Sequence, residues 1–346
     1  MKLGIIGYYG HSNYGDERIL YCIKRFFSKC DFLITSGWED ARKRMNDLNQ
    51  CDYILIGGGG LILRNIGYRT DIIRGLRKPF GLIGISIETK HRSMEKFLEI
   101  IKNKAEFILV RDKQSKNYLN NHYKVILGPD LTFLYPFDVV SELKEDICGL
   151  NLRDWHYWKA TLHGRYYNLM QHLNNKFTWL EKYYPFVKWD PNRVIKIVKK
   201  KFEEVLPIPL YFESNCTNDK NILSKYFKNV PAQFNIKFYE HIRYLVGMRY
   251  HSLAFATQCG IPFVSLSYEP KNENFCSDIR LNNLSINIYK LNELENKINY
   301  IKNNYQQIRK HIILYRDKYI REIKYILQSI LHLVNESNEE KEYGSE

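Results

Sequence analysis

The sequence predicts an α/β fold with two halves, each built around a parallel β-sheet. Continuously apolar segments of strand length alternate with segments that have the three-to-four-residue apolar spacing of a helix. Strands that are apolar throughout indicate a parallel sheet covered on both faces by helices. The alternation restarts near residue 147, and a chain of 346 residues accommodates two domains of ordinary size.

The first half, residues 1–140, is predicted to form one Rossmann-like domain. Its apolar strand segments are KLGIIGYYG (2–10), CDYILIGGGG (51–60), KPFGLIGISI (78–87), AEFILVRD (105–112) and the start of YKVILGPDLTFLY (123–135). Helical periodicity follows three of them, at residues 15–27, 93–104 and 113–121. A polar stretch at 138–146 then separates the two halves.

The second half, residues 147–290, repeats the alternation around an aromatic insert. Strands are predicted at 147–153, 207–214, 243–249, 260–268 and 285–289, with helices at 195–206, 220–229 and directly after Met248. The insert, residues 154–190, is rich in Trp, Tyr and His. Two interpretations of it stay open, a small helical subdomain or a set of rings that stack on sugar faces. The side chains concerned are Trp155, Trp158, Tyr166 and Trp179.

Residues 291–334 are predicted to form one long amphipathic helix or two helices in series. Apolar residues recur there every three or four positions, at Leu294, Ile298, Ile301, Tyr305, Ile308, Ile312, Tyr315 and Tyr319. The opposite face is basic, with Lys302, Arg309, Lys310, Arg316, Lys318, Arg321 and Lys324. The acidic tail, 335–346, is predicted to be disordered.

Composition limits the class of protein and its partners. The net charge of +14 and the pI near 9.2 favour anionic partners. The Lys residues are spread along the chain, and no zinc-finger spacing or RNP-like motif is present, which argues against nucleic-acid binding. The seven cysteines are scattered without a CxxC pair, as is typical of a reduced protein. Neither a signal-peptide pattern nor a bilayer-length apolar segment occurs, so the expected location is cytoplasmic.

Two glycine-rich segments follow predicted strands and are candidate ligand-facing loops. GYYGHSNYGDE (7–17) leads into a helix that Asn13 or Asp16 is placed to cap, with Gly15 between them. Its glycine spacing differs from the dinucleotide GxGxxG, which weakens a nicotinamide interpretation. GGGGLIL (57–63) carries Gly58, Gly59 and Gly60 at the carboxyl end of a strand, the edge where open α/β sheets bind ligands. An ordinary capped turn and a packing role are the alternatives.

Basic residues follow three other predicted strands. GMRYHSLAFATQCGIP (247–262) places Arg249 and His251 where a strand passes into an apolar helix. An arginine at a helix start suits a phosphate or carboxylate, and a histidine exchanges protons near neutral pH. Lys271 follows the next strand, and Arg111 ends the strand at 105–112. For Arg111 alone, a capped surface turn explains the pattern equally well.

Taken together, these motifs resemble the polysaccharide pyruvyl transferase family. The resemblance rests on GYYGHSNYGDE, GGGGLIL, VRDKQS (110–115), GPDLTF (128–133) and GMRYHSLAFATQCGIPFVSLSYEPK (247–271), in that order, and spans roughly residues 4 to 275. It implies two Rossmann-like domains that face a cleft, as in GT-B glycosyltransferases. It also implies transfer of pyruvate from phosphoenolpyruvate to two hydroxyls of a sugar in a cell-surface polysaccharide or its precursor.

The resemblance also implies roles for individual residues. Arg111, Arg249 and Lys271 would bind the anionic donor, and His251 would be the general acid or base. Asp16 would orient or deprotonate the acceptor. The glycine loops, with Asn13, Gly15, Gly58, Gly59 and Gly60, would shape the acceptor side. Neither a metal nor a cofactor beyond phosphoenolpyruvate is expected.

Other hypotheses remain beside this one. A GT-B glycosyltransferase that uses a nucleotide sugar would have the same fold, and a sugar-binding protein with a decayed site would have lost part of the basic set. The basic C-terminal helix also suggests peripheral contact with an anionic membrane and a lipid-linked acceptor. The alternative for that helix is packing of its Ile/Tyr stripe across the two domains.

Overall fold

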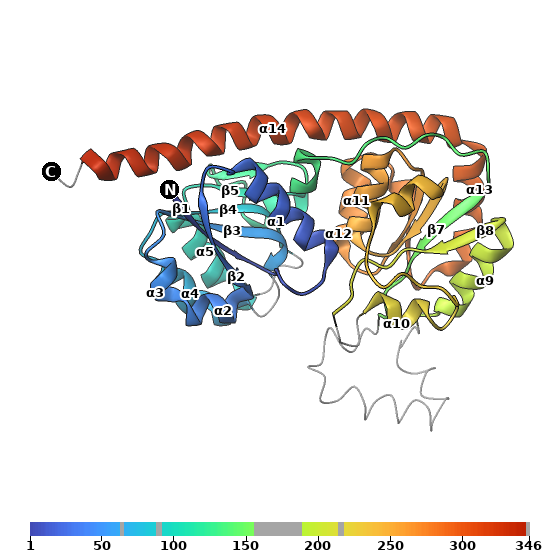
Figure 1. Ribbon diagram of the computed structural model, residues 1–346, viewed down its shortest axis with the longest axis horizontal. Helices are drawn as coiled ribbons and strands as arrows, with labels where there is room; N and C mark the ends of the chain where they lie inside the picture. The colour runs from blue at the N-terminus through green and yellow to red at the C-terminus, as the bar shows by residue number, and fades with distance from the viewer. Residues whose placement is uncertain (63–65, 88–91, 156–188, 214–217, 344–346) are drawn as a thin grey trace, which may run out of the picture.

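The computed structural model describes residues 1–62, 66–87, 92–155, 189–213 and 218–343 of the chain. Two parallel sheets form the cores of two domains that lie side by side, and one long helix runs along both (Figure 1). The α/β fold class with two parallel-sheet domains is therefore confirmed. Most of the aromatic insert, including Trp158, Tyr166 and Trp179, lies outside the described residues.

The N-terminal domain has a six-stranded parallel sheet in the order β2-β1-β3-β4-β5-β6. Its strands are β1 (Lys2–Gly7), β2 (Asp31–Ser36), β3 (Tyr53–Ile62), β4 (Phe80–Ile87), β5 (Ile108–Val110) and β6 (Val125–Leu127). Its helices are α1 (Tyr14–Phe26), α2 (Gly37–Lys43), α3 (Met45–Leu48), α4 (Thr70–Gly75), α5 (Glu95–Lys104) and α6 (Lys113–Tyr118), with 3-10 turns η1 (Ile66–Arg69), η2 (Arg92–Met94) and η3 (Leu131–Leu134).

Both faces of this sheet are buried, which explains why its strands are apolar throughout. Along β3, Tyr53 and Leu55 pack in one apolar cluster with Ile19 of α1. Ile54 and Ile56 point the other way, into a second cluster with helices α2 to α6. The alternation of side chains along a strand therefore supplies two cores from one continuous apolar run.

The C-terminal domain has a five-stranded parallel sheet in the order β11-β10-β9-β7-β8. Its strands are β7 (Ile147–Asn151), β8 (Glu204–Pro207), β9 (Tyr244–Gly247), β10 (Phe263–Ser267) and β11 (Ser285–Asn287). Its helices are α9 (Pro191–Lys201), α10 (Asp219–Leu223), α11 (Tyr250–Cys259), α12 (Pro270–Asp278) and α13 (Leu294–Asn303), with 3-10 turns η5 (Ile236–His241), η6 (Asn282–Leu284) and η7 (Leu291–Glu293). All side chains of α11 are buried, and it ends at Gly260 in the left-handed conformation.

Helix α14 (Tyr305–Tyr343) runs along both domains, and its end projects past the N-terminal domain (Figure 1). The predicted apolar stripe is buried, from Tyr305 through Ile312 to Tyr319, and burial continues to Val334. The helix contacts η3 of the first domain and α11 of the second. The packing interpretation of the stripe is therefore confirmed. The helix also continues to Tyr343, through most of the segment predicted to be a disordered tail.

Arg309 and Arg316 of α14 fasten the segment that connects the two domains. Arg309 donates to the carbonyls of Gly260 and Val140, both at 2.6 Å. Arg316 donates to the Gln258 carbonyl at 2.7 Å and to the Phe137 carbonyl at 3.1 Å. Each arginine thus joins the C-terminal end of α11 to the linker, because both segments present carbonyls that no helix or strand satisfies.

Several secondary-structure predictions need correction. The strand β2 and helices α2, α3, α4 and α12 were not predicted, and the helix predicted at 195–206 ends at Lys201, before β8. β3 does not end at the glycines but passes through them to Ile62, with positive φ at Gly58 and Gly59. The strand predicted at 207–214 is wrong, because β8 ends at Pro207 and the next residues turn toward the other domain.

Candidate active site

A cavity of about 750 Å³ lies between the two domains, at the carboxyl ends of their strands. The predicted residues that line it are Asn13, Asp16, Gly58, Gly59, Gly60, Arg111, Arg249, His251 and Lys271. The three glycines lie within β3, and the other residues follow β1, β5, β9 and β10, so both sheets direct their carboxyl ends at one space. The structure thus brings together side chains that the sequence places far apart.

The remaining predicted residue, Gly15, packs directly against His251. A Cβ on Gly15 would lie 1.9 Å from His251 Nδ1, which no side chain can tolerate. Gly15 is in the first turn of α1 and His251 in the first turn of α11. The two domains therefore meet at the starts of these helices, and glycine is needed there to let the imidazole approach.

Asp130 is buried at the centre of the site and connects the two domains. Its Oδ2 accepts a hydrogen bond from Arg111 at 2.8 Å and lies 3.7 Å from His251 Nε2. Its Oδ1 accepts from the amide and the hydroxyl of Thr132. Burial by itself would raise the pKa of this carboxyl, but the nearby His251, Arg111 and Thr132 hydroxyl lower it below its usual range. A permanent negative charge thus lies between Arg111 and His251.

Arg111 is held from three sides. Besides the bond to Asp130, its Nε donates to Ser86 at 2.7 Å, and its guanidinium lies 4.1 Å from the ring centre of Tyr250. Only 6% of the residue is exposed, and it still reaches the cavity. The cation is therefore fixed in position before any ligand binds.

Asp16 is a second buried carboxyl in the site, and its pKa is shifted upward, whereas that of Asp130 is shifted downward. Asn13 donates to its Oδ2 at 2.5 Å, and a Cβ on Gly59 would lie 2.7 Å from its Oδ1. Burial raises the pKa of Asp16, although the charges of His251, Arg111 and Lys271 counteract part of that effect. A carboxyl with a raised pKa can exchange a proton nearer to neutral pH, as a general acid or base must.

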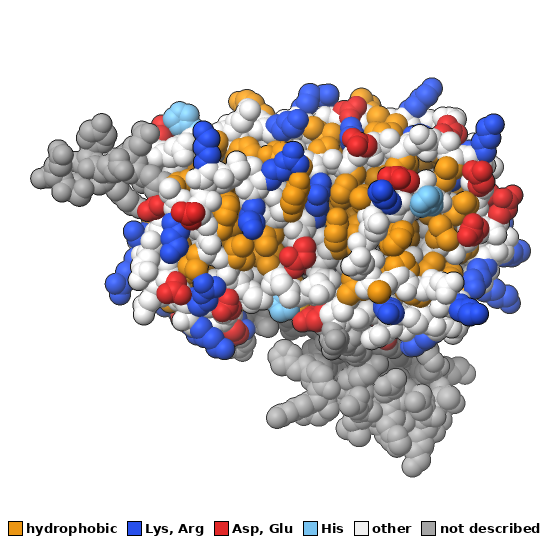
Figure 2. Space-filling view, viewed as in Figure 1, with side chains coloured by type: hydrophobic (Ala, Val, Ile, Leu, Met, Phe, Trp, Pro, Cys, Tyr) orange, Lys and Arg blue, Asp and Glu red, His pale blue; other side chains and the backbone are white. Residues whose placement is uncertain are grey.

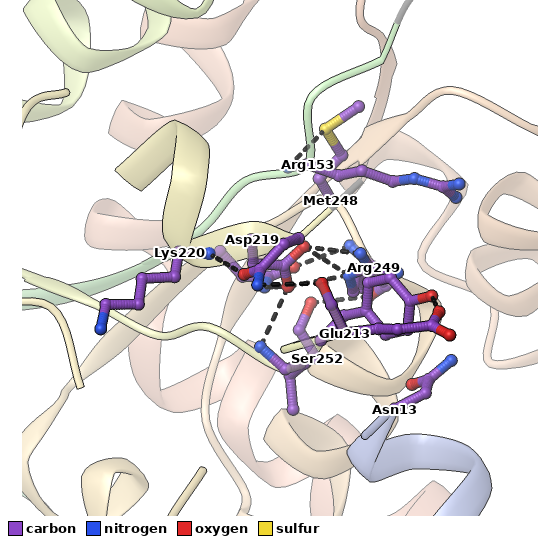
Figure 3. Close-up of polar contacts among 12 residues, drawn as sticks. Asn13, Arg153, Glu213, Asp219, Lys220, Met248, Arg249 and Ser252 are labelled. Carbon is purple, nitrogen blue, oxygen red and sulfur yellow. Dashed lines mark hydrogen bonds and ion pairs between the residues drawn. The ribbon is translucent and has the colours of Figure 1, made fainter. Parts of the chain in front are cut away.

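Arg249 is held by a carboxylate that sequence reasoning did not identify. Its Nε donates to both oxygens of Asp219, at 2.7 and 2.8 Å, and its Nη2 lies 2.6 Å from Oδ1 (Figure 3). Asp219 is fully buried and also accepts from the Leu210 amide. Asn151, at the end of β7, accepts from the Arg249 amide at 2.8 Å. The guanidinium is thus oriented rigidly at the start of α11.

Further cationic and aromatic groups complete the C-terminal side of the cavity. Lys271 Nζ lies 2.6 Å from Glu269 Oε2. Arg153, two residues past β7, donates to the Tyr268 hydroxyl at 3.1 Å, and Trp155 lies close to both. Neither Arg153 nor Tyr268 was predicted as a site residue.

The loop after β1 crosses to the C-terminal domain at the rim of the cavity. Asn13 and Tyr211 form an antiparallel bridge, and the Tyr14 amide donates to the Leu210 carbonyl at 2.9 Å. His11 Nδ1 lies 2.9 Å from Glu213 Oε1, while His11 Nε2 lies 2.9 Å from Ser36 Oγ. The segment predicted as a strand after Pro207 therefore forms a contact between domains.

The unpredicted residues carried faint signals. Asp130 lies within GPDLTF, one of the motifs that carry the family resemblance, but the pattern predicts no role for its carboxyl. Arg153 closes the predicted strand 147–153, in the position that Arg111 has in the first half. Asp219 had no signal, because it begins the short helix α10 and its contact with Arg249 arises only from the tertiary fold. Among the residues that the structure describes, no group of three or more His, Cys, Asp or Glu could hold a metal ion.

The fold and the cavity define a class of enzyme, in which two Rossmann-like domains face one ligand cleft as in the GT-B fold. The sequence model for polysaccharide pyruvyl transferases matches residues 13–270, about three-quarters of the chain. The protein therefore belongs to the polysaccharide pyruvyl transferase family and is a transferase. A search of curated proteins found no match.

Solved structures with a similar fold include proteins bound to UDP or to a UDP-sugar. Anabaena HepE with UDP and glucose has a TM-score of 0.60 at 10% identity, over 97% of this chain and 100% of that chain. HepE with UDP-glucose has a TM-score of 0.61 at 11% identity, with the same coverage. The UDP-GlcNAc 2-epimerase of Neisseria meningitidis bound to UDP-GlcNAc has a TM-score of 0.50 at 11% identity, over 96% and 100% of the two chains. At these identities the likeness shows the fold alone.

Proposed function

We propose that this transferase moves pyruvate from phosphoenolpyruvate onto two hydroxyls of a sugar, in a cell-surface polysaccharide or its precursor. The product is a cyclic ketal, and inorganic phosphate is released. One hydroxyl proton ends on the methylene carbon, which becomes a methyl group, and the other leaves with the phosphate. The family supplies the reaction class, and the chemistry of the cleft supports this donor.

The observation that carries the proposal is the convergence of Arg111, Arg249 and Lys271 on the space beside His251. Phosphoenolpyruvate has a phosphate and a carboxylate, and fixed arginines pair well with both. Because Asp130 and Asp219 hold the two guanidinium groups in place, little reorganisation is needed when an anion binds.

Proton transfer needs one acid for the methylene carbon and one base for the acceptor hydroxyls. We assign His251 to the donor, because it lies beside Asp130 and two residues after Arg249 along the chain. We assign Asp16 to the acceptor, since it lies among the glycine loops of the N-terminal domain and has a raised pKa. The charge of His251 acts on Asp16, and Gly15, the residue before Asp16, contacts the imidazole.

Phosphate release tests this proposal. Purified enzyme is incubated with phosphoenolpyruvate and a panel of glycosides that offer pairs of neighbouring hydroxyls, and free phosphate is measured. We expect acceptor-dependent release that falls by about 100-fold or more in His251→Ala. His241→Ala, on the exposed surface of η5, is the matched control and should keep full activity. Absence of release with every acceptor would reject the proposed donor chemistry.

A nucleotide-sugar glycosyltransferase is the second candidate. The observation that favours it is the similarity in fold to HepE, whose structures contain UDP with glucose and UDP-glucose. Arg249 would then bind a diphosphate. Thermal stabilisation by UDP, without a response to phosphoenolpyruvate, would favour this candidate.

Contact with an anionic membrane surface is a further part of the proposal, with the protein on the cytoplasmic side. The exposed residues of α14 include Lys310, Lys318, Arg321 and Lys324, and basic side chains stand along that edge of the molecule in Figure 2. Each basic residue near such a surface contributes about 1 kcal/mol. No described helix has the length and apolarity to cross a bilayer. Failure to sediment with anionic vesicles at low salt would reject this contact.

A further inference from the structure

Arg153 is a cationic side chain of the cleft. Neither the family motifs nor the sequence pattern predicts a role for it. It follows β7, while Arg249 follows β9 and Lys271 follows β10. These three strands are neighbours in the sheet order. Their carboxyl ends therefore bring three cationic side chains to one edge, and all three line the cavity.

Arg153 differs from the other cations of the cavity in its partners. Arg111 is paired with Asp130, Arg249 with Asp219, and Lys271 with Glu269. Among the described residues, no carboxylate lies within ion-pair distance of Arg153. The charges of Glu269 and Asp219 reach it, but each of these carboxylates already holds another cation. Arg153 therefore carries a positive charge that no carboxylate of the described residues neutralises by an ion pair.

The guanidinium of Arg153 is nevertheless held in a fixed place. Its Nη1 donates to the Tyr268 hydroxyl at 3.1 Å, and the group lies 5.1 Å from the ring centre of Trp155 and 5.2 Å from that of Tyr268. Its Nε is buried and has no hydrogen-bond partner among the described residues. In Figure 3 the side chain extends away from the Asp219–Arg249 pair. The residue lines the cavity, so its guanidinium is placed to meet a ligand there.

We propose that Arg153 binds the phosphate group of the donor substrate, an inference that rests on the proposed function. A phosphate dianion carries more charge than a carboxylate and needs the cation that is not already compensated. Arg249 and Lys271 at the same sheet edge would share that phosphate. Arg111, which reaches the cavity from the opposite domain, would be left for the carboxylate.

Thermal-shift titrations with three probes test this assignment: phosphoenolpyruvate, inorganic phosphate and pyruvate, which lacks the phosphate. In Arg153→Gln we expect the apparent affinity for phosphoenolpyruvate and for phosphate to fall by about 10- to 100-fold. The apparent affinity for pyruvate should not change. Arg153→Lys should recover part of the loss, because it restores charge without the planar donor pair. Arg193→Gln, exposed on α9, is the matched control and should behave as wild type.

The outcomes separate this inference from the proposed function. Wild-type binding of phosphoenolpyruvate with no change in Arg153→Gln would overturn the role of Arg153 alone. Equal weakening of all three probes would also overturn it, since the effect would not follow the phosphate. Arg153-dependent binding of phosphate without binding of phosphoenolpyruvate would keep the role and reject the donor. If wild type bound neither phosphoenolpyruvate nor phosphate, both would fall.

Discussion

Asp130 Oδ2 lies 3.7 Å from His251 Nε2, although the two residues belong to different domains. The same oxygen accepts a hydrogen bond from Arg111 at 2.8 Å. Thr132 makes a second connection between Asp130 and the C-terminal domain. Its hydroxyl donates to Asp130 and accepts a hydrogen bond from Gln258 of α11 at 2.9 Å. One buried carboxylate therefore contributes both to the contact between the domains and to the geometry of the site.

Replacing Asp130 with Asn should destabilise the protein. The change leaves Arg111 buried without its counter-charge, which costs about 3–5 kcal/mol when one partner of a buried pair is removed. The free energy of unfolding, measured with urea at neutral pH, should fall by that amount. Asp138→Asn, at an exposed position in the linker, is the control. An Asp130→Asn protein as stable as wild type would show that Asp130 does not hold the site together.

The same variant should show a defined pH dependence. The pKa of Asp130 is lowered in the folded protein, so its contribution to stability is present above the pKa of an unfolded aspartate. That contribution is lost as the pH falls through the folded-state value. The difference in stability between wild type and Asp130→Asn should thus be full at neutral pH and shrink in the acid range. A difference that grows on acidification would contradict the assignment.

Asp16→Asn should change stability in the opposite direction. Because the pKa of Asp16 is raised by burial, its stabilising contribution is present at low pH and is lost as the pH rises through the folded-state value. At neutral pH the amide removes the cost of a buried charge, so Tm should rise, and the gain should vanish below about pH 4. Activity should fall by about 100-fold or more. A lower Tm at neutral pH would mean that the charged carboxylate stabilises the fold.

Gly15→Ala tests the contact between the two helix starts. The new Cβ would overlap His251, so the imidazole or a whole domain must move. Displacements of this size at a catalytic group cost about 100-fold in rate, and phosphate release should fall accordingly. Gly75→Ala is the control, since its Cβ would meet only the flexible end of Met45 at 3.2 Å. Normal activity in Gly15→Ala would exclude a fixed position for His251.

Arg316→Met tests the attachment of α14 to the linker. The carbonyls of Gln258 and Phe137 would lose their donor, which costs about 1–3 kcal/mol per buried group left unsatisfied. We expect lower stability to urea and faster proteolysis within residues 137–146. Arg321→Met, exposed on the same helix, should change neither property. Equal rates of linker cleavage in both variants would refute the role given to Arg316.

Much of the fold could be predicted because a strand buried on both faces must be apolar. β1, β3, β4 and β9 were predicted for this reason. β2 was not, since this edge strand is only half buried and its sequence DFLITS is mixed. The false strand after Pro207 has an apolar sequence for another reason: Ile208 and Leu210 are buried in the core, while Tyr211 bridges to Asn13. Core burial of a segment without regular structure and burial within a sheet leave the same local sequence pattern.

The candidate site was predictable where a residue type and a strand end coincided. Arg111, Arg249 and Lys271 met that condition and lie together. Asp130 and Asp219 did not stand out, since their role is to hold those arginines and depends on contacts across 19 and 30 residues of sequence. A buried counter-charge cannot be paired with its arginine from one sequence alone, because the pairing is made by the tertiary fold.

Calorimetric titration of the wild-type protein with phosphoenolpyruvate, beside UDP, tests the central claim most directly. The proposed binding of the donor by Arg111, Arg249 and Lys271, together with Arg153, predicts saturable binding of phosphoenolpyruvate and no binding of UDP under the same conditions. Saturable binding of UDP with no heat from phosphoenolpyruvate would contradict the proposed donor and make this transferase a nucleotide-sugar enzyme.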